Sequence, residues 1–561
     1  MTSSYEDKPW LKSYSLGPFK LKHSMEPYPE INIYQFLEDA ARDYPEVTAC
    51  VYADEEITYP QLKDKVDRLA SALVDLGVSK GTAVATVLPS CPEFIIADYA
   101  CMKIGAVHVP LSVLHKADDL KHELKESNTE YVVCSYRRIP RLNEVKPETN
   151  VKTVIYTPTK LFPDYELPQM DEVSDQGYYL MDDLIAKHKP HTETVEIDPK
   201  TDIALLPFTG GTTGVPKGTM LTHYNITSNV VQTVHWMMDP LKAGIVGKGA
   251  TTICVPIFHS YGHWAIHASI SWGLKMFLMD PRDMMKIVEV INEYRPAIVF
   301  AVPAHYVAFV DMPLNKGQIF YYSAAAALPP ELAEEFEKIS GVPMGEGYGA
   351  TETTAGATVN ISAFSKVTGF MKQVKRGVGV PLPDTDVRVV DPETGEEPPV
   401  GEPGELWVKG PQIMAGYWPT PGSGIEEGGW LRMGDMVKMD EDGYFTVVDR
   451  IKDMINVGGN KVYSRVIDDI LHEHPAVEVA GVIGVPDPDR PGSERVKAFI
   501  QLEPEFRGKI TEEEIIEFLK DKVKPYAVPK FVEFRDELPL TLIMKLHKKL
   551  LREEELAKKE E

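Results

Sequence analysis

The fold of this chain is decided by one short stretch, Phe208-Thr209-Gly210-Gly211-Thr212-Thr213-Gly214-Val215-Pro216-Lys217-Gly218, which begins where the apolar run of residues 203–208 ends. Glycines allow backbone conformations with positive φ, which can turn N–H groups toward an anion. The threonine hydroxyls add further hydrogen-bond donors, and Lys217 adds a positive charge. This composition favours a phosphate-binding loop.

The stretch differs from the P-loop of nucleoside triphosphatases, which ends Gly-Lys-[Ser/Thr] and opens a helix. Here the lysine precedes the glycine, and Pro216 stands directly before Lys217. Helix initiation at the lysine is therefore disfavoured. A flexible surface loop between two strands is the alternative interpretation, and the rest of the chain decides between the two.

Length and composition indicate a multidomain globular protein. The 561 residues are several times the usual length of one domain. Contents of 43% hydrophobic and 25% charged residues are ordinary for soluble proteins. The net charge of −25 argues against nucleic-acid binding, because duplex binding relies on basic side chains that release counterions. Small anionic ligands can still bind at a locally basic site.

Cysteine usage and the N-terminus both point to the cytoplasm. The five cysteines are scattered without a CxxC pair, which predicts reduced thiols. Residues 1–8 lack an apolar segment, so we expect no signal peptide. Residues 297–310 are the best candidate for a membrane span, but they are too short and contain Pro303 and His305. Peripheral membrane contact and a homodimer both stay open.

Alternating helical and β patterns predict an α/β fold. Apolar positions with helical period occupy residues 33–43 and 61–76, residues 84–88 form a β-branched run, and a helix–strand unit covers residues 93–109. Such alternation indicates an α/β layer architecture.

Later segments continue this pattern with one interruption. Residues 146–200 are rich in Pro, Asp, Glu and Thr, and we expect a surface connection with a single helix at residues 180–188. The apolar runs at residues 298–302 and 319–323 predict buried strands.

The glycine stretch is similar to the phosphate-binding signature of the AMP-forming acyl-CoA synthetases, adenylate-forming enzymes that include luciferases and peptide-synthetase adenylation domains. The family signature is usually written Thr-Ser-Gly-Thr-Thr-Gly-x-Pro-Lys-Gly, and Gly210 replaces its serine. The resemblance implies that residues 209–214 and Lys217 bind the phosphates of ATP. Further motifs follow in the family's order.

A second motif with a specific pattern is Glu346-Gly347-Tyr348-Gly349-Ala350-Thr351-Glu352-Thr353. Tyr348, between two glycines, offers a ring on which adenine can stack. Thr351 offers a hydroxyl to the α-phosphate, and Glu352 offers a hard oxygen ligand for Mg²⁺. A glycine-bounded tight turn is the alternative. Both motifs in this order identify the chain as similar to the family.

Other segments resemble the family's nucleotide site. Ser323-Ala324-Ala325 follows a strand candidate and could simply open a helix. In the family, the corresponding small residues lie flat against adenine. Asp435, in Gly429-Trp-Leu-Arg-Met-Gly-Asp435, matches a carboxylate that accepts hydrogen bonds from ribose hydroxyls. The resemblance implies that Arg450 completes this ribose clamp.

His259 follows a strand candidate within Val255-Pro-Ile-Phe-His259. A lone histidine in this position is often structural. In the family, a Phe-His pair at this point borders the pocket for the acyl carboxylate. Amino-acid-activating relatives carry aspartate at the second position to hold the substrate ammonium. The resemblance therefore implies an acyl-pocket role for His259 and disfavours an amino-acid substrate.

The C-terminal part carries the remaining implied residues. Lys545 is in register with the family's catalytic lysine, although without the other motifs it would be an ordinary residue of a basic tail. Gly458 and Gly459 match a loop that lines the pantetheine channel, and Lys452 matches the hinge. The resemblance implies a large N-terminal α/β domain of several subdomains at residues 1–449 and a small mobile C-terminal α+β domain at residues 450–561.

The resemblance implies a ligase that activates a carboxylic acid with Mg·ATP to acyl-AMP and then transfers the acyl group to CoA. We favour a medium- or long-chain fatty acid as substrate, with an aryl acid as the nearest alternative and a luciferase-like oxygenase or a carrier-protein ligase as more remote ones. A catalytically impaired nucleotide-binding protein is the rival. Five residues depart from the family pattern: Gly210, Met433, Ser464, Val466 and Met544.

Overall fold

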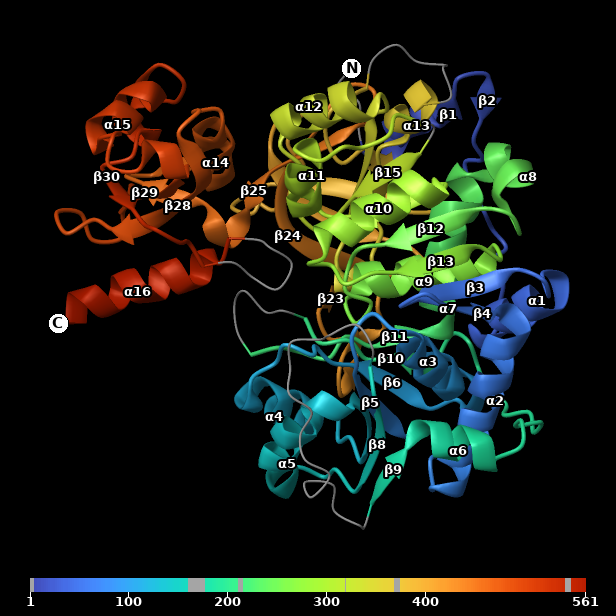
Figure 1. The fold of residues 1–561 in the computed structure, drawn as a ribbon. Helices are drawn as coiled ribbons and strands as arrows, with labels where there is room; N and C mark the ends of the chain where they lie inside the picture. Colours follow the sequence, from blue (N-terminus) through green and yellow to red (C-terminus); the bar gives the residue numbers. More distant parts are fainter. Residues whose placement is uncertain are drawn as a thin grey trace.

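Two large sheets and their helices build the N-terminal part of the chain, and a smaller unit follows it, drawn in orange and red in Figure 1. The computed structural model describes residues 5–159, 177–209, 215–317, 319–367, 374–539 and 546–560. The predicted α/β class is confirmed. The division into a large N-terminal and a small C-terminal domain is also confirmed, whereas the boundary between residues 449 and 450 stays a prediction.

A seven-stranded sheet has the order β11-β10-β6-β5-β7-β8-β9, in which β11 is Leu221–Thr222 and β10 is Ile203–Leu205. Its centre is parallel, with β5 (Ala83–Val87) between β6 (Val107–Pro110) and β7 (Tyr131–Ser135). α1 (Tyr34–Asp43) and α2 (Tyr59–Asp75) agree with the predicted helices. Thr58 caps α2 by accepting a hydrogen bond from the Gln61 amide, which is how a capping box starts a helix.

Two helices buried on nearly every side lie among these layers: α3 (Pro92–Ile104) and α9 (Ser260–Ser271). Their apolar side chains belong to one cluster that also contains residues of both large sheets. A helix that is apolar all round belongs in the interior of a large protein. Several polar side chains on these two helices, including Asp98, His263 and His267, are therefore removed from water.

A nine-stranded sheet has the order β18-β17-β16-β15-β14-β12-β13-β3-β4. Five of these strands are β18 (Val380–Pro381), β17 (Thr358–Val359), β13 (Lys275–Leu278), β3 (Thr48–Tyr52) and β4 (Glu55–Thr58). Its parallel centre contains β12 (Ala250–Ile253), β14 (Ile298–Ala301), β15 (Phe320–Ser323) and β16 (Met344–Tyr348). β14 and β15 are the two buried strands that the apolar runs predict. Ligands of such open sheets bind outside the carboxyl ends of the strands, and this is the edge where the second motif begins.

The expectation for residues 146–200 is wrong in part. The helix is present as α6 (Met181–Lys187), but β8 (Thr153–Thr157) and β9 (Tyr178–Leu180) are strands of the seven-stranded sheet. Val154 and Ile155 of β8 are fully buried. The apolar run in β8 is short and has polar neighbours, so its periodicity is too weak to predict a strand. Pairing with the neighbouring strands of the sheet decides that this segment is a strand.

Most of the remaining strands form one antiparallel sheet and one three-stranded sheet. β19 (Asp386–Val390), β20 (Gly404–Lys409), β24 (Trp430–Met439) and β25 (Phe445–Arg450) form an antiparallel sheet. In the small domain, β28 (Val477–Pro486), β29 (Glu494–Leu502) and β30 (Phe531–Phe534) pack with α14 (Ser464–His472) and α15 (Glu512–Lys520). The chain closes with α16 (Lys548–Glu560).

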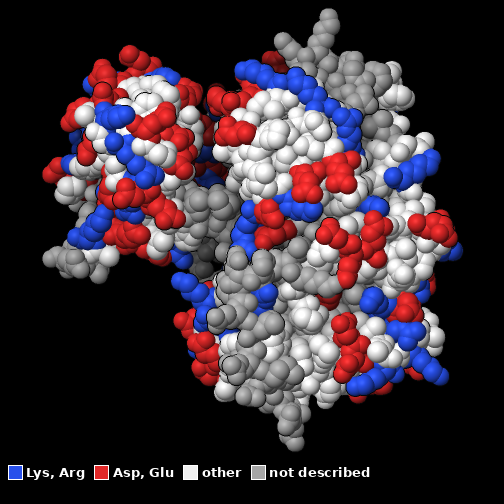
Figure 2. All heavy atoms as spheres, in the orientation of Figure 1, with Lys and Arg blue, Asp and Glu red and all other residues white. Residues whose placement is uncertain are grey.

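The charged side chains, the cysteines and the apolar helices can be compared with what the composition predicts. Acidic and basic side chains are interspersed over the face of the small domain shown in Figure 2. All five cysteines are buried and unpaired, as expected of small core residues. Within the described ranges, no helix combines the length and the apolar character needed to cross a membrane. Residues 297–310 instead hold β14 and α11 (Pro303–Val310).

Replacing Ile155 by alanine tests whether β8 belongs to the core. The side chain is fully buried, so its truncation should lower the free energy of unfolding by about 2 to 5 kcal/mol. Urea unfolding followed by circular dichroism measures the change. Lys152→Ala is the control, because that side chain is 69% exposed. Similar effects of the two substitutions would mean that β8 is a surface segment.

Candidate active site

The carboxyl ends of β15 and β16 bring two predicted segments side by side. The strands pair in parallel, with Ser323 opposite Glu346. The chain does not continue into a helix after Ser323, because Ala325 has φ of 66° and turns the backbone away. The Ser323 hydroxyl is buried without a hydrogen-bond partner. Small side chains and one unsatisfied hydroxyl therefore line this strand edge.

The glycines of the second motif are required by close packing. A Cβ atom at Gly347 would lie 1.8 Å from the Tyr322 hydroxyl, and one at Gly349 would lie 2.0 Å from the Ala355 carbonyl oxygen. The 3-10 turn η8 (Thr351–Thr353) follows. The motif is thus a tight turn, and that turn leaves Thr351 and Glu352 partly exposed to solvent.

Asp435 joins three parts of the candidate site. The Tyr348 hydroxyl donates to Oδ2 of Asp435 at 2.6 Å, and Nε of Arg450 donates to Oδ1 at 3.0 Å. Asp435 and Arg450 are opposite each other in the β24–β25 ladder. Burial and the Asp435 charge raise the pKa of Tyr348 well above its usual value, so the hydroxyl stays protonated and donates. The predicted ribose residues therefore lie together.

Tyr417 is a residue of this region that the sequence analysis missed. Its hydroxyl donates to Oε1 of Glu352 at 2.8 Å, and Nζ of Lys217 lies 5.1 Å from its ring centroid. A cation over an aromatic face is attracted by the ring. Tyr417 thus links the second motif to the end of the glycine stretch. The available signal was an aromatic pair, Tyr417-Trp418, between Gly416 and Pro419.

The backbone around Tyr417 fixes this link. Next to β21 (Gly416–Tyr417), the Trp418 amide donates to the Gly218 carbonyl at 2.8 Å. The Met414 amide donates to the Glu352 carbonyl, also at 2.9 Å. These bonds attach one short segment to both predicted phosphate-site motifs, so Lys217 and Glu352 are positioned against the same strand.

The glycine stretch itself is described only at its ends. Phe208 pairs with Gly218 in an antiparallel bridge, and the Thr209 amide donates to the Lys217 carbonyl at 3.0 Å. The two ends of the stretch therefore pair with each other as in a hairpin. Gly210, Gly211, Thr212, Thr213 and Gly214 lie outside the described residues, as does Lys545. Their roles stay predictions.

His259 is the N-cap residue of α9. Its Nδ1 accepts a hydrogen bond from the Tyr261 amide at 3.4 Å. This contact gives the side chain a structural function at the turn after β12. A role in the acyl pocket stays a prediction.

The predicted hinge and channel residues lie at the start of the small domain. Gly458 and Gly459 form the turn of a hairpin between β26 (Ile455–Val457) and β27 (Asn460–Val462), and their φ angles of 58° and 89° suit glycine. Their amides donate to Ser493 Oγ and Asn456 Oδ1. Nζ of Lys452 is buried without a hydrogen-bond partner, and burial together with the Arg450 charge lowers the pKa of Lys452 to about 8.

Glu346 is a buried carboxyl group at the same strand end. Burial raises its pKa to about 7, and the positive charge of Arg465 in the small domain opposes this shift. The side chain therefore holds its proton to a higher pH than an exposed glutamate does. Its position next to the Ser323 strand end makes it part of the candidate nucleotide site.

Family models match both parts of the chain. The model for the AMP-binding enzyme matches residues 37–418, and the model for the AMP-binding enzyme C-terminal domain matches residues 466–545. The long-chain-fatty-acid–CoA ligase of Bacillus subtilis is 34% identical, with 98% of each chain covered. The enzyme of the same name from Escherichia coli O6:H1 is 31% identical, again with 98% of each chain covered.

Solved structures share the fold. ATP-bound MatB from Rhodopseudomonas palustris superposes with a TM-score of 0.81 at 27% identity, covering 94% of this chain and 99% of that one. The anthranilate CoA ligase AuaEII, in complex with anthranoyl-AMP, gives a TM-score of 0.82 at 24% identity and covers 96% and 100%. The second likeness concerns the fold alone.

Glu346 should make stability depend on pH. Its folded pKa of about 7 exceeds the ordinary 4.5, so the folded state holds the proton more tightly. The stabilisation is complete below pH 4.5 and is lost as the pH rises through about 7. Glu346→Gln should abolish this fall, which amounts to about 3 kcal/mol.

Urea unfolding from pH 5 to pH 8 measures this difference. Glu335→Gln, on the exposed face of α12 (Pro330–Ser340), is the matched control and should keep the wild-type profile. Parallel profiles for wild type and Glu346→Gln would show that Glu346 titrates normally.

Proposed function

Because this chain belongs to the AMP-binding enzyme family, we propose that it is an AMP-forming ligase that joins a long-chain fatty acid to CoA. The fatty-acid carboxylate attacks the α-phosphate of ATP, which gives acyl-AMP and releases pyrophosphate. The CoA thiol then displaces AMP and forms the thioester. The observation that carries this proposal is the relationship to long-chain-fatty-acid–CoA ligases over nearly the whole chain. The contacts of Tyr348 and Arg450 with Asp435 support the proposal at the nucleotide site.

We assign ribose binding to Asp435 and its two neighbours. Each Asp435 oxygen already accepts one hydrogen bond, from Tyr348 or from Arg450. An ionised carboxylate offers about four acceptor positions, so two ribose hydroxyls can still donate to it. Ser323, Ala324 and Ala325 supply the small surface against which adenine would lie.

The phosphate end needs positive charge rather than a general base. A carboxylic acid with an ordinary pKa of about 4 is already ionised at neutral pH, so the barrier comes from repulsion between anions. Lys217, Lys545 and the amides of the glycine loop would stabilise the charge that develops on the α-phosphate. Thr351 would add a hydroxyl donor. Tyr417 holds one oxygen of Glu352 in place.

Glu352 also fits the role of Mg²⁺ ligand. Mg²⁺ in nucleotide sites usually binds through one or two carboxylates and the substrate phosphates. Glu352 is partly exposed and oriented by the Tyr417 hydroxyl, so its second oxygen is available in the right part of the site. A bound Mg²⁺ would neutralise the charge of the leaving pyrophosphate.

The acyl and thiol ends of the site are assigned from the family resemblance. His259 would border the fatty-acid carboxylate from its position at the start of α9. For thioester formation, Lys545 would have to leave the site and the Gly458-Gly459 turn would have to approach it, since both belong to the small domain. We place the pivot of this rotation at Lys452, just after β25, where a change in backbone angles disturbs no strand pairing.

A panel of acids tests the proposed reaction. With ATP and Mg²⁺, hexadecanoate should release pyrophosphate faster than octanoate, and benzoate, malonate and glycine should be poor substrates. Addition of CoA should give thioester and AMP in equal amounts. Coupled pyrophosphate detection and chromatography of the thioester provide the measurements. A preference for benzoate would identify an aryl-acid ligase, and no release with any acid would indicate the catalytically impaired protein.

Tyr417→Phe should weaken the first half reaction selectively. The change keeps the ring beside Lys217 and removes the hydrogen bond to Glu352, which is worth about 1.5 to 3 kcal/mol for a charged acceptor. The kcat/KM for adenylation should fall roughly tenfold to a hundredfold, and more Mg²⁺ should be needed for half-maximal rate.

Single-turnover assays separate the two half reactions of this variant. Thioester formation from preformed acyl-AMP should be unchanged, because Glu352 is not needed there. Tyr526→Phe, at a side chain in the small domain that is 41% exposed, is the control. Equal losses in both half reactions would contradict the role assigned to Tyr417.

A further inference from the structure

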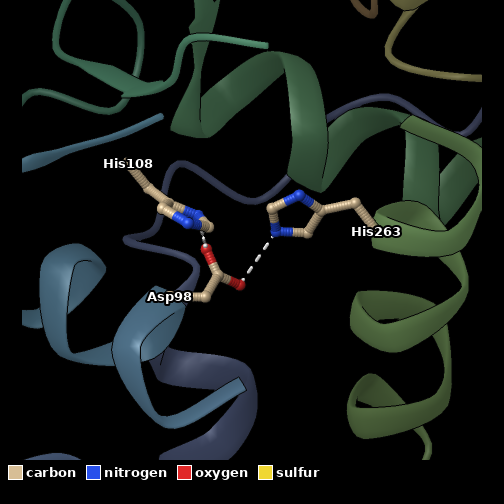
Figure 3. Close-up of side chains that lie close together, drawn as sticks. All are labelled: Asp98, His108 and His263. Atoms are coloured by element: carbon tan, nitrogen blue, oxygen red, sulfur yellow. Dashed lines mark hydrogen bonds and ion pairs between the residues drawn. The ribbon is translucent and has the colours of Figure 1, made fainter. Parts of the chain in front are cut away.

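Three ionisable side chains meet deep in the large domain. Asp98 comes from α3, His108 from β6 and His263 from α9, and Figure 3 shows the two imidazole rings flanking the Asp98 carboxylate. None of the three is more than 1% exposed. Their donor atoms all lie within 4.8 Å of one another. The proposed reaction uses none of them.

The contacts within this cluster are not all hydrogen bonds. Nδ1 of His108 lies 2.7 Å from Oδ1 of Asp98 and is hydrogen-bonded to it. Nε2 of His263 lies 2.9 Å from Oδ2, yet neither ring nitrogen of His263 nor Oδ2 has an aligned hydrogen-bond partner. Two atoms that bind the same metal ion lie close together in this way without forming a hydrogen bond to each other. Buried polar atoms without partners are rare and need an explanation.

A fourth side chain points at the same carboxylate oxygen. His267 follows His263 by one helical turn on α9, and the two rings stack with centroids 4.9 Å apart. Nε2 of His267 lies 3.8 Å from Oδ2 of Asp98 and has no hydrogen-bond partner. Histidines spaced by four residues on one helix face can bind one metal ion together.

Outer contacts orient two of the imidazole rings. Nε2 of His108 shares a hydrogen bond of 2.8 Å with the Thr86 hydroxyl, and Nδ1 of His267 shares one of 3.0 Å with the Tyr99 hydroxyl. The inner nitrogens of both rings are thereby turned toward Asp98. Metal-ligating histidines are usually held in this way through the ring nitrogen that does not bind the metal.

The negative charge of the buried Asp98 carboxylate also favours binding of a cation. Every ion pair of Asp98 in the described part of the chain is with a histidine. A carboxylate removed from water is costly unless a positive charge accompanies it. A divalent ion would supply that charge at the centre of the four side chains.

We propose that Asp98, His108, His263 and His267 form a structural site for a divalent transition-metal ion, and that Zn²⁺ suits it best. Three imidazole nitrogens and one carboxylate oxygen are a donor set that favours Zn²⁺ in tetrahedral geometry. Ligand bonds of about 2.0 to 2.1 Å place tetrahedral ligands about 3.3 Å apart. Within the Asp98–His108–His263 group, the contacts of 2.7 and 2.9 Å reach this spacing through small side-chain shifts. His267, whose Nε2 lies 3.8 Å from Oδ2 of Asp98, lies outside that group and moves inward by a rotation of its ring to complete the four ligands.

The site would join α9 to α3 and to the seven-stranded sheet. Four protein ligands leave no open position for substrate, so the ion has a structural rather than a catalytic function. α9 starts at His259, so the ion would also hold the helix that carries the proposed acyl-pocket residue. The proposal does not depend on the proposed reaction.

Metal analysis of the full-length chain without a polyhistidine tag tests the proposal. Mass spectrometry of the purified protein should find one Zn²⁺ per chain. Protein stripped by a chelator should have a lower Tm, regain it on addition of Zn²⁺, and show the visible bands of tetrahedral Co²⁺ when Co²⁺ replaces Zn²⁺. A metal-free protein whose Tm and spectrum do not respond to either ion would overturn the proposal and leave a hydrogen-bonded Asp–His cluster.

Variants locate the ion within the fold. Asp98→Asn and His263→Gln should each lose the bound Zn²⁺ and the Co²⁺ bands, and Thr86→Val should weaken binding about tenfold to a hundredfold through the lost outer contact. His235→Gln changes another partly buried histidine, which contacts Ser271 at 3.1 Å, and should bind like wild type. Unchanged metal content in the Asp98 and His263 variants would place the ion elsewhere. If these variants fail to fold, the wild-type measurements still decide.

Discussion

The carboxylate of Asp435 is the interaction on which the arrangement of the candidate site depends. It binds Tyr348 from the nine-stranded sheet and Arg450 from the last strand before the small domain. Its own strand, β24, belongs to a third sheet. One buried anion with two donors thus ties the end of one sheet to the edge of another. Loss of Arg450 would leave the Asp435 charge without its ion-pair partner, and loss of the Tyr348 hydroxyl would remove one of its two hydrogen bonds, so these contacts keep the three segments in register.

Packing restricts the rest of the site around this point. Gly347 and Gly349 leave no room for a side chain, so the strand end and the turn approach their neighbours closely. Tyr417 then attaches that turn to Lys217. The outcome is a rigid edge made of strand ends, with the glycine stretch attached at its two ends. Preorganised groups of this kind stabilise a developing charge without having to rearrange.

One departure from the family pattern acquires a structural explanation. Ser464 stands where a proline is usual, and its hydroxyl accepts a hydrogen bond from Lys548 at 2.8 Å. Lys548 also pairs with Asp468 at 2.5 Å. These contacts fasten the start of α16 to α14, close to the segment that carries Lys545. Proline could not accept that bond, so the serine belongs to a local polar network and does not by itself indicate an impaired enzyme.

The sequence by itself determined the fold class, several of the helices and strands, and the family to which the chain belongs. Those features depend on local patterns, such as apolar periodicity and glycine spacing, which neighbouring residues contain in full. The tertiary structure alone decided that β8 joins a sheet, that Tyr417 holds Glu352, and that Asp98 meets His263. Each of these contacts joins residues far apart in the chain through strand order and helix packing. No local pattern specifies such pairings, because the energy that selects them comes from burial against distant segments.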